Sequence, residues 1–246
     1  MTDSTHGPTR VPPPTGSPAP SPAVTTTDFA ESALLRDSYR VAVKRIADAL
    51  LAGFALAVLS PLLLLIAIAV RLDSPGPVFF HQVRVGQNRR RMNAGLPAGM
   101  VERRVKPGFG REFRMFKFRT MRQDSTTYSR SPRDSSDPRV TRVGQLLRRT
   151  SLDELLQLLN VLTNDMSLVG PRPEMPFIVE SYEPVHLLRL TVKPGLTGLW
   201  QLHGPRHRPM HAAIEWDLQY IQTWSLRLDA KIIWNTVFFV LRGRNF

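Results

Sequence analysis

The sequence predicts an α+β fold that is mostly helical and associated with a membrane, and three observations support this. An apolar run of 25 residues extends from Ile46 to Val70 and contains a single charge, Asp48. Two short segments, 77–86 and 111–121, alternate apolar and polar residues and are rich in aromatics, as β-strands are. Beyond residue 138, apolar residues recur mostly at helical spacing. We therefore expect an N-terminal membrane segment, a small β-hairpin and amphipathic helices, some of them at the membrane interface.

The N-terminal segment, residues 1–36, is rich in Pro, Ser and Thr and has almost no apolar periodicity ("GPTRVPPPTGSPAPSPAVTTT"). It can bury too little apolar surface to offset the entropy lost on ordering, so we expect it to be disordered. No apolar core follows a basic start near Met1, which argues against a signal peptide. The predicted domains are this tail, a membrane segment at 39–73, and a domain at 74–246 with a basic insertion at 87–111.

The apolar run is long enough to cross a bilayer as one helix. At ~1.5 Å per residue it reaches roughly 37 Å, against a hydrocarbon core of ~30 Å. Ser60 and Pro61 lie near its middle, where a proline removes a backbone donor and bends a helix. Basic residues flank the run on both sides, so the positive-inside rule assigns no direction. These features fit either a kinked spanning helix or a re-entrant helix-hairpin that turns at Ser60 and Pro61.

The positive charge is concentrated in one segment. The formal net charge is +13, and the stretch from Arg84 to Arg149 holds 18 Lys/Arg against 5 Asp/Glu, so it carries the whole excess. Much of it lies in the long loop 87–111 between the two predicted strands. Such clusters favour phosphates, nucleic acid or an acidic membrane surface as partners. The absence of cysteine excludes disulfides and thiolate metal sites.

Helical periodicity predicts five helices after the strands, at about 139–150, 151–163, 176–190, 211–223 and 228–242. The last of them has an apolar face with Trp234 and basic ends. That pattern fits a helix lying on a membrane, and equally one packed in the domain core. Three histidines at every fourth position, His203, His207 and His211, do not predict a zinc site, because prolines between them interrupt a helix.

The stretch "RRTSLDELLQLLN", residues 148–160, has two interpretations. In the structural one, Ser151 and Glu154 form a capping box, and Asp153 and Glu154 stabilise the first turn of a helix through its dipole. In the functional one, the two carboxylates carry chemistry, and Arg148 holds an anion beside them.

Further basic residues could complete such an anion site. Lys117 and Arg119 lie two apart on one face of a predicted strand. Arg172 lies in a "GPRP" turn that its prolines stiffen, and Arg206 lies in "GPR". Each alone is an ordinary arginine or lysine, but together with Arg148 they predict an anion site beside two carboxylates, close to a membrane.

From about Tyr39 to the C-terminus the chain resembles the bacterial sugar transferase family, the monotopic polyprenyl-phosphate phosphoglycosyl transferases. The resemblance rests on ordered blocks: "KRIAD", "SP" in the apolar run, "GPVFFHQVRVG", "FKFRTM", "DPRVTRVGQLLRRTSLDELLQLLNVL", "DMSLVGPRPE", "KPGLTGLWQ" and "YIQTWSLRLDAKII". The family implies that Asp153 is the nucleophile and that Asp153 and Glu154 bind Mg²⁺. Asp217 matches a recurrent acidic position of the family, with a substrate-binding or a structural role.

The resemblance also implies a reaction. Asp153 attacks the β-phosphate of a UDP-sugar, UMP leaves, and a polyprenyl phosphate (undecaprenyl or decaprenyl) takes the phosphosugar, which begins glycan or exopolysaccharide assembly. The resemblance further implies that the catalytic domain lies on the cytoplasmic face of the bacterial inner membrane, and that Ser60 and Pro61 form the hinge of a re-entrant helix. Lipid is then a partner, nucleic acid is not expected, and a homodimer stays open, as do glucose, galactose and N-acetylated amino sugars as the transferred group.

Two departures from the family pattern stand out: the loop 87–111 is longer, and the sequence around Arg206 diverges. The competing hypothesis is a membrane-tethered, arginine-rich protein that binds nucleic acid or anionic lipid without catalysis. A third is a conventional glycosyltransferase, which would release UDP instead of UMP.

Overall fold

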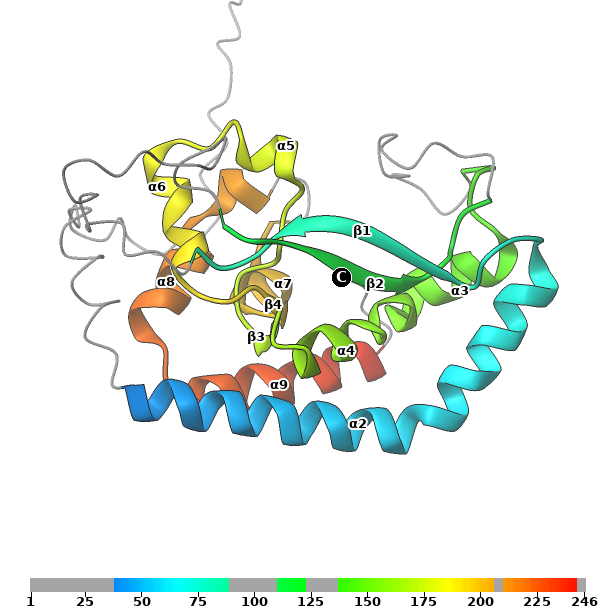
Figure 1. Ribbon diagram of the computed structural model, residues 1–246, viewed down its shortest axis with the longest axis horizontal. Coiled ribbons are helices and arrows are strands. Elements are labelled where there is room, and N and C mark those ends of the chain that lie inside the picture. The colour runs from blue at the N-terminus through cyan, green and yellow to red at the C-terminus, as the bar shows by residue number, and fades with distance from the viewer. Residues whose placement is uncertain (1–37, 89–109, 123–136, 206–209, 243–246) are drawn as a thin grey trace, which may run out of the picture.

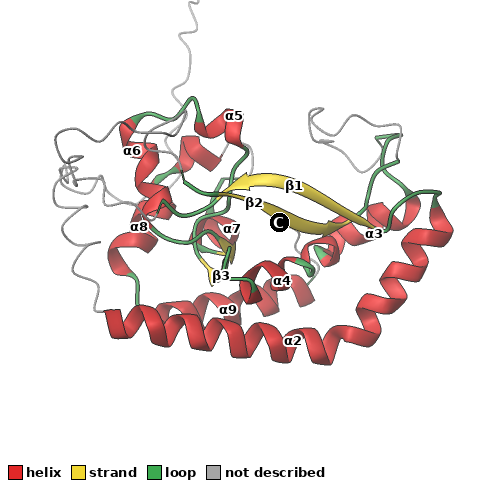
Figure 2. Cartoon of the chain, in the orientation of Figure 1, coloured by secondary structure: helices red, strands yellow, loops and turns green. Residues whose placement is uncertain are grey.

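The computed structural model describes residues 38–88, 110–122, 137–205 and 210–242, and within them the protein is mostly helical with two small sheets (Figures 1 and 2). This agrees with the predicted fold class. The predicted disordered tail, most of the basic loop 87–111, and Arg206 lie outside the described residues.

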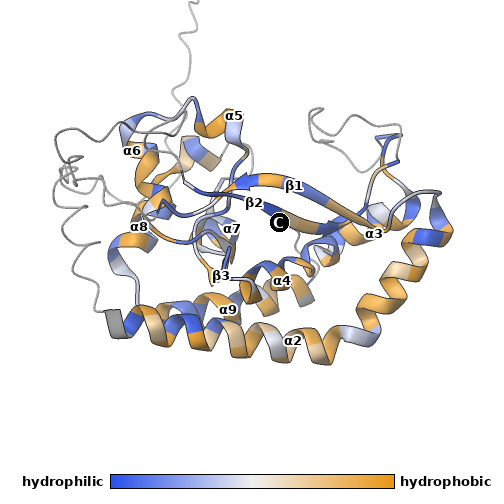
Figure 3. Cartoon of the chain, viewed as in Figure 1, coloured by the Kyte–Doolittle hydropathy of each residue, from blue (hydrophilic) through white to orange (hydrophobic). Residues whose placement is uncertain are grey.

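The long helix α2 (Ser38–Asp73) is apolar enough to associate with a membrane. Over Arg40–Asp73 its most apolar window has a mean hydropathy of 2.6, and only 11% of that window is buried. In Figure 1, α2 runs along one edge of the molecule beside α9 (Leu226–Leu241) and then bends towards α3 (Arg142–Thr150). Its exposed side chains include large hydrophobics, and so do those of α9. Figure 3 shows hydrophobic residues along both helices. The two helices therefore present apolar surface suited to lipid.

Ser60 and Pro61 lie inside α2, which continues through them as a helix without reversing. Pro61 has no N–H to donate to the carbonyl of Ala57, four residues earlier. The hydroxyl of Ser60 donates to that carbonyl instead, at 2.8 Å, so the backbone acceptor is satisfied. The pair thus lets an apolar helix keep a proline, and re-entrant topology stays a prediction.

The predicted hairpin is confirmed as an antiparallel pair, β1 (Phe79–Val85) and β2 (Glu112–Phe118), in which Phe79 pairs with Phe118 and Val85 with Glu112. Phe113 and Met115, two apart on one face of β2, are buried, and so is Phe118 at the end of the strand. A second sheet was not predicted. It is a parallel pair of three-residue strands, β3 (Ser167–Val169) and β4 (Gly195–Thr197), and strands this short give no periodic signal.

The helices match the predictions at α3, α8 and α9 and are broken elsewhere. The expected helix 151–163 is a 3₁₀ turn, η1 (Leu152–Glu154), followed by α4 (Gln157–Leu162). The expected helix 176–190 is three short pieces, because Pro184 interrupts it. In chain order, the remaining elements are α5 (Pro176–Val179), α6 (Pro184–Leu187), η2 (Leu188–Thr191), α7 (Leu199–His203), η3 (Met210–Ala213) and α8 (Glu215–Thr223).

Candidate active site

The two adjacent carboxylates lie on η1, directly after the end of α3. Ser151 ends α3 in the left-handed conformation (φ 56°), and its backbone N–H donates to carbonyls of the last turn of that helix. Its side chain caps nothing, so the predicted capping box with Glu154 is wrong. The left-handed residue turns the chain sharply, and the following turn carries Asp153 and Glu154 into contact with β2.

Glu154 is held by two cations from different parts of the chain. Lys117 of β2 approaches Oε1 at 2.6 Å, while Arg172 donates from Nη1 to Oε2 at 3.0 Å and from Nη2 to Oε1. Burial alone would raise the pKa of this carboxyl, but the charges and hydrogen bonds of Arg172 and Lys117 outweigh it and hold the pKa far below the usual range. Glu154 is therefore a fixed anion.

Asp153, one residue earlier, is in the opposite situation. Its side chain is buried, and among the described residues its carboxylate accepts no hydrogen bond. Burial raises its pKa to about 6; the charge of Glu154 adds to this rise, and Lys117, Arg172 and Arg148 oppose it. We expected a helix dipole to stabilise the ionised form of Asp153. Burial dominates its pKa instead, and Asp153 lies on a 3₁₀ turn and not at the start of a regular helix. The carboxylate is left ready for a ligand or a reaction.

Of the predicted anion-binding residues, Lys117, Arg148 and Arg172 are brought near the carboxylate pair. Arg119 is not: its guanidinium is buried against the C-terminal end of α2, where it donates to Pro75 O at 2.7 Å and to Ser74 O at 2.6 Å. Arg119 comes directly after the last residue of β2, so its side chain does not follow the alternation that would have placed it on the same face as Lys117. Its role in the structure is to hold the end of the membrane helix.

Asp217 is also directed elsewhere. Its Oδ2 accepts from Nε of Arg189 at 2.6 Å, and both side chains are buried. The structure thus shows an ion pair between α8 and η2, which fits the structural role, and a substrate-binding role for Asp217 stays a prediction.

Arg84 of β1 belongs to the site and was not predicted. Its Nη1 donates to Pro173 O at 3.2 Å and its Nη2 to Gln82 Oε1 at 2.6 Å. Burial, and next the charge of Arg172, lower its pKa to about 10. The strand alternation places Gln82 and Arg84 on one face of β1, and this pattern is the signal by which it could have been found.

The carboxylate pair fits a hard divalent cation. Mg²⁺ takes oxygen ligands and is held by one or two carboxylates plus substrate phosphates. Among the described residues no hydrogen bond reaches the two carboxylate oxygens of Asp153, and Glu154 keeps one lone-pair position on Oε2 beside Arg172. The described part of the chain contains no group of three or more His, Asp or Glu side chains that could hold a metal ion, so the ion would depend on this pair and on substrate oxygens.

The chain is similar to known proteins over most of its length. The family model "Bacterial sugar transferase" matches residues 39–243. A UDP-glucose:undecaprenyl-phosphate glucose-1-phosphate transferase of Xanthomonas campestris pv. campestris is 43% identical over 80% of the chain, but the chain spans only 38% of that relative's length.

Two further relatives differ in length and in name. A UDP-N-acetylgalactosamine-undecaprenyl-phosphate N-acetylgalactosaminephosphotransferase of Aeromonas hydrophila is 38% identical over 82% of the chain and 44% of its own length. An exopolysaccharide production protein of Rhizobium leguminosarum bv. phaseoli is 39% identical over 83% of the chain and 98% of its own length. From this match and these identities, the chain belongs to the bacterial sugar transferase family.

Proposed function

We propose that the protein transfers a sugar 1-phosphate from a UDP-sugar to a polyprenyl phosphate, through a covalent phosphosugar on Asp153. The observation that carries the proposal is the division of roles between neighbouring carboxylates. Glu154 is locked by Lys117 and Arg172, whereas Asp153 is buried and has no hydrogen-bond partner among the described residues. A poorly solvated, unpaired carboxylate is more reactive as a nucleophile than one in water or in an ion pair.

In the first step, one carboxylate oxygen of Asp153 attacks the β-phosphorus of the donor. A P–O bond to Asp153 forms, the P–O bond to the α-phosphate breaks, and UMP leaves with the bonding electrons. Arg172, Lys117 and Arg148 supply positive charge around the carboxylates. That charge would neutralise the phosphate oxygens as negative charge shifts onto UMP.

In the second step, a phosphate oxygen of the polyprenyl phosphate attacks the same phosphorus. The acyl phosphate bond breaks, the electrons return to the carboxylate of Asp153, and a polyprenyl diphosphate sugar is released. Covalent catalysis thereby replaces one difficult displacement by two. No proton has to be removed from either nucleophile when both are ionised.

A divalent cation, Mg²⁺ in our proposal, would be held by Asp153 and the free position of Glu154. When bound it would neutralise charge on the diphosphate. Lys117 and Arg172, which both contact Glu154, would hold its carboxylate in a fixed orientation for the ion.

The membrane surface supports a lipid acceptor. The exposed apolar residues of α2 and α9 offer a place for lipid, and α2 contacts α3 and α4, which flank the catalytic turn. We place the site on the cytoplasmic face, where nucleotide sugars are found. The names of the relatives include both glucose and N-acetylgalactosamine donors, so either class of sugar is a candidate.

The test is nucleotide release from a panel of UDP-sugars by the full chain in detergent, with Mg²⁺ and polyprenyl phosphate. UMP released with one or a few donors, and lost in Asp153→Asn, is the expected result. Release of UDP would instead indicate ordinary glycosyl transfer. No release from any donor, in membranes as in detergent, would overturn the proposal and favour a binding protein.

A further inference from the structure

The turn 170–174, which carries Arg172, has its main chain anchored at every carbonyl after Gly170. Two of the donors are backbone amides of the neighbouring strands, and two are arginine side chains. The contacts are Gly195 N to Pro171 O at 2.9 Å, Arg189 Nη2 to Arg172 O at 3.0 Å, Arg84 Nη1 to Pro173 O at 3.2 Å, and Val85 N to Glu174 O at 2.9 Å. The orientation of Arg172 is thus set by parts of the chain far from it in sequence.

Arg189, on η2, is the deepest of these anchors. It is 4% exposed, and each of its three guanidinium nitrogens has a partner. Nε donates to Asp217 Oδ2 at 2.6 Å, Nη1 to Glu174 Oε1 at 3.2 Å and to the hydroxyl of Tyr182, and Nη2 to Arg172 O. The planar fork of an arginine can hold several acceptors in fixed directions, which a lysine cannot do.

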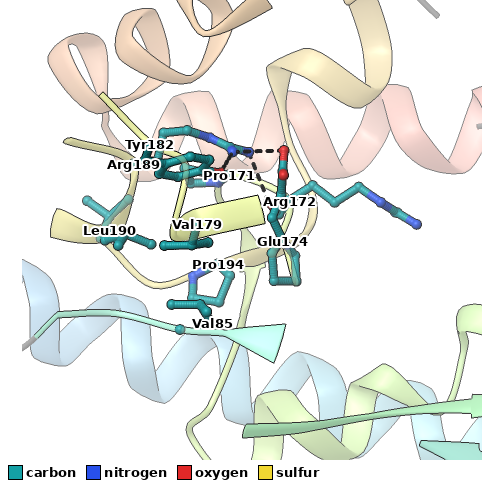
Figure 4. A pocket seen from close by; sticks show the side chains of 12 residues that line it. Val85, Pro171, Arg172, Glu174, Val179, Tyr182, Arg189, Leu190 and Pro194 are labelled. Carbon is teal, nitrogen blue, oxygen red and sulfur yellow. Dashed lines mark hydrogen bonds and ion pairs between the residues drawn. The ribbon is translucent and has the colours of Figure 1, made fainter. Parts of the chain in front are cut away.

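Arg189 and the side chain of Arg172 do not act on the same groups. In Figure 4 the side chain of Arg172 extends away from Arg189, whereas the carboxylate of Glu174 points towards it. Arg189 contacts Arg172 at the carbonyl, and the guanidinium of Arg172 contacts Glu154 of the catalytic pair. Four of the five N–H donors of Arg189 bond to protein groups, and the side chain is buried, so Arg189 is directed at the protein and not at a substrate.

We propose that Arg189 is a positioning residue for the transfer reaction: it fixes the turn 170–174 so that Arg172 meets Glu154 with two hydrogen bonds. Asp217 and Glu174 in turn fix Arg189, so Asp217 acts through Arg189 and not on the substrate. The inference rests on the proposed function. A guanidinium misplaced by about 1 Å at a reacting centre can cost about 100-fold in rate.

The first experiment is a double-mutant cycle with Arg189→Lys and Arg172→Lys, measured as kcat/KM for UMP release. Lysine keeps the buried charge opposite Asp217 and Glu174 but loses the fork. We expect Arg189→Lys to lower kcat/KM by about 100-fold, and the double variant to lose no more than Arg172→Lys alone, because both changes act on one contact. Losses that multiply would overturn the inference.

A matched control separates this effect from general loss of stability. Arg45 of α2 also holds main-chain carbonyls, donating to Val161 O and Leu162 O at 2.6 Å each, but at the end of α4. Arg45→Lys removes the same kind of contact, and we expect it to leave kcat/KM for UMP release unchanged. A fall of kcat/KM in Arg45→Lys equal to that in Arg189→Lys would contradict a specific role for Arg189.

Hydrogen exchange gives a readout that does not depend on turnover. The amides of Val85 and Gly195 donate to the carbonyls of Glu174 and Pro171, so their exchange reports on the turn. We expect faster exchange at these two amides for Arg189→Lys, and for the milder Asp217→Asn should Arg189→Lys fail to fold, with other core peptides unchanged. Unchanged exchange at Val85 and Gly195 would overturn the inference. Should the wild type release no UMP, the proposed function fails, and exchange still decides whether Arg189 positions the turn.

Discussion

This protein has two buried ionic clusters, and they differ in whether each of their carboxylates accepts hydrogen bonds. In the cluster between α2 and α9, the carboxylates are satisfied: Asp229 accepts from Lys44 at 2.6 Å, from Tyr220 at 2.8 Å and from Trp224 at 3.0 Å. In the same cluster Asp48 accepts from Ser167 at 2.7 Å.

The cluster around η1 holds Glu154 as tightly, with Lys117 and Arg172, but leaves Asp153 beside it without a hydrogen bond among the described residues. A buried carboxylate costs free energy unless it is paired and hydrogen-bonded. A fully bonded acid therefore stabilises the fold, whereas an unbonded one marks a site whose partner arrives from outside. The comparison predicts that neutralising an acid has opposite consequences in the two clusters.

The largest expected effect is that of Asp153→Asn, which should abolish UMP release, by about 10⁴-fold or more, because the nucleophile is lost. The same change should stabilise the protein near pH 7 in EDTA. The rise in pKa from 3.8 to about 6 corresponds to about 3 kcal/mol of stability. The wild type loses it as pH rises through this range, because the carboxyl ionises in the unfolded chain while the folded protein still holds the proton. Asparagine never ionises, so it avoids this loss.

The measurement is denaturant unfolding of both proteins in detergent and EDTA, at pH 4 and at pH 7. We expect the variant to gain stability relative to the wild type at pH 7 and the gain to vanish towards pH 4, where Asp153 is protonated. A variant less stable than the wild type at pH 7 would contradict the distinction between the clusters.

The next largest effect is expected for Asp229→Asn, which removes the carboxylate charge that the ammonium of Lys44 and the indole N–H of Trp224 both contact. Breaking a buried ion pair by neutralising one partner typically costs about 3–5 kcal/mol. We therefore expect a clear loss of stability in the same unfolding measurement, with the KM for the UDP-sugar unchanged in the folded fraction. An altered KM with unaltered stability would show that the α2–α9 cluster belongs to the active site.

The two clusters also show what the sequence could reveal. The membrane segment, the hairpin and the Asp153–Glu154 pair follow from patterns local in the chain, namely apolar length, strand alternation and adjacency. The capping box of Ser151 is equally local in sequence, yet the left-handed turn at Ser151 overrides it. Arg119 was expected beside Lys117, but the chain turns after β2, and its guanidinium meets the end of α2.

The contacts that orient the site residues join positions far apart in the sequence, so the spacing of apolar residues does not reveal them. Arg84 and Arg189 are 89 and 17 residues away from the turn carbonyls that they hold. The parallel pair β3–β4, which brings residue 170 beside residue 195, has strands of three residues each. Such pairings depend on tertiary packing, so the sequence predicts the carboxylates and Arg172 but not what aims them.

The smallest effect is expected in the apolar helix α2, where a hydroxyl and not a charged group satisfies a backbone carbonyl. Ser60→Ala removes the hydroxyl that donates to Ala57 O, and Pro61 offers no amide to replace it. We expect a loss of about 0.5–1.5 kcal/mol of stability, the net value of one hydrogen bond, with catalysis retained. Pro61→Ala in the Ser60→Ala background restores a backbone donor and should recover most of that loss, because the amide of residue 61 can then bond to Ala57 O. Unfolding of the two variants and the wild type in lipid bicelles measures this, and a double variant less stable than Ser60→Ala would show that Pro61 fixes a bend that the protein needs.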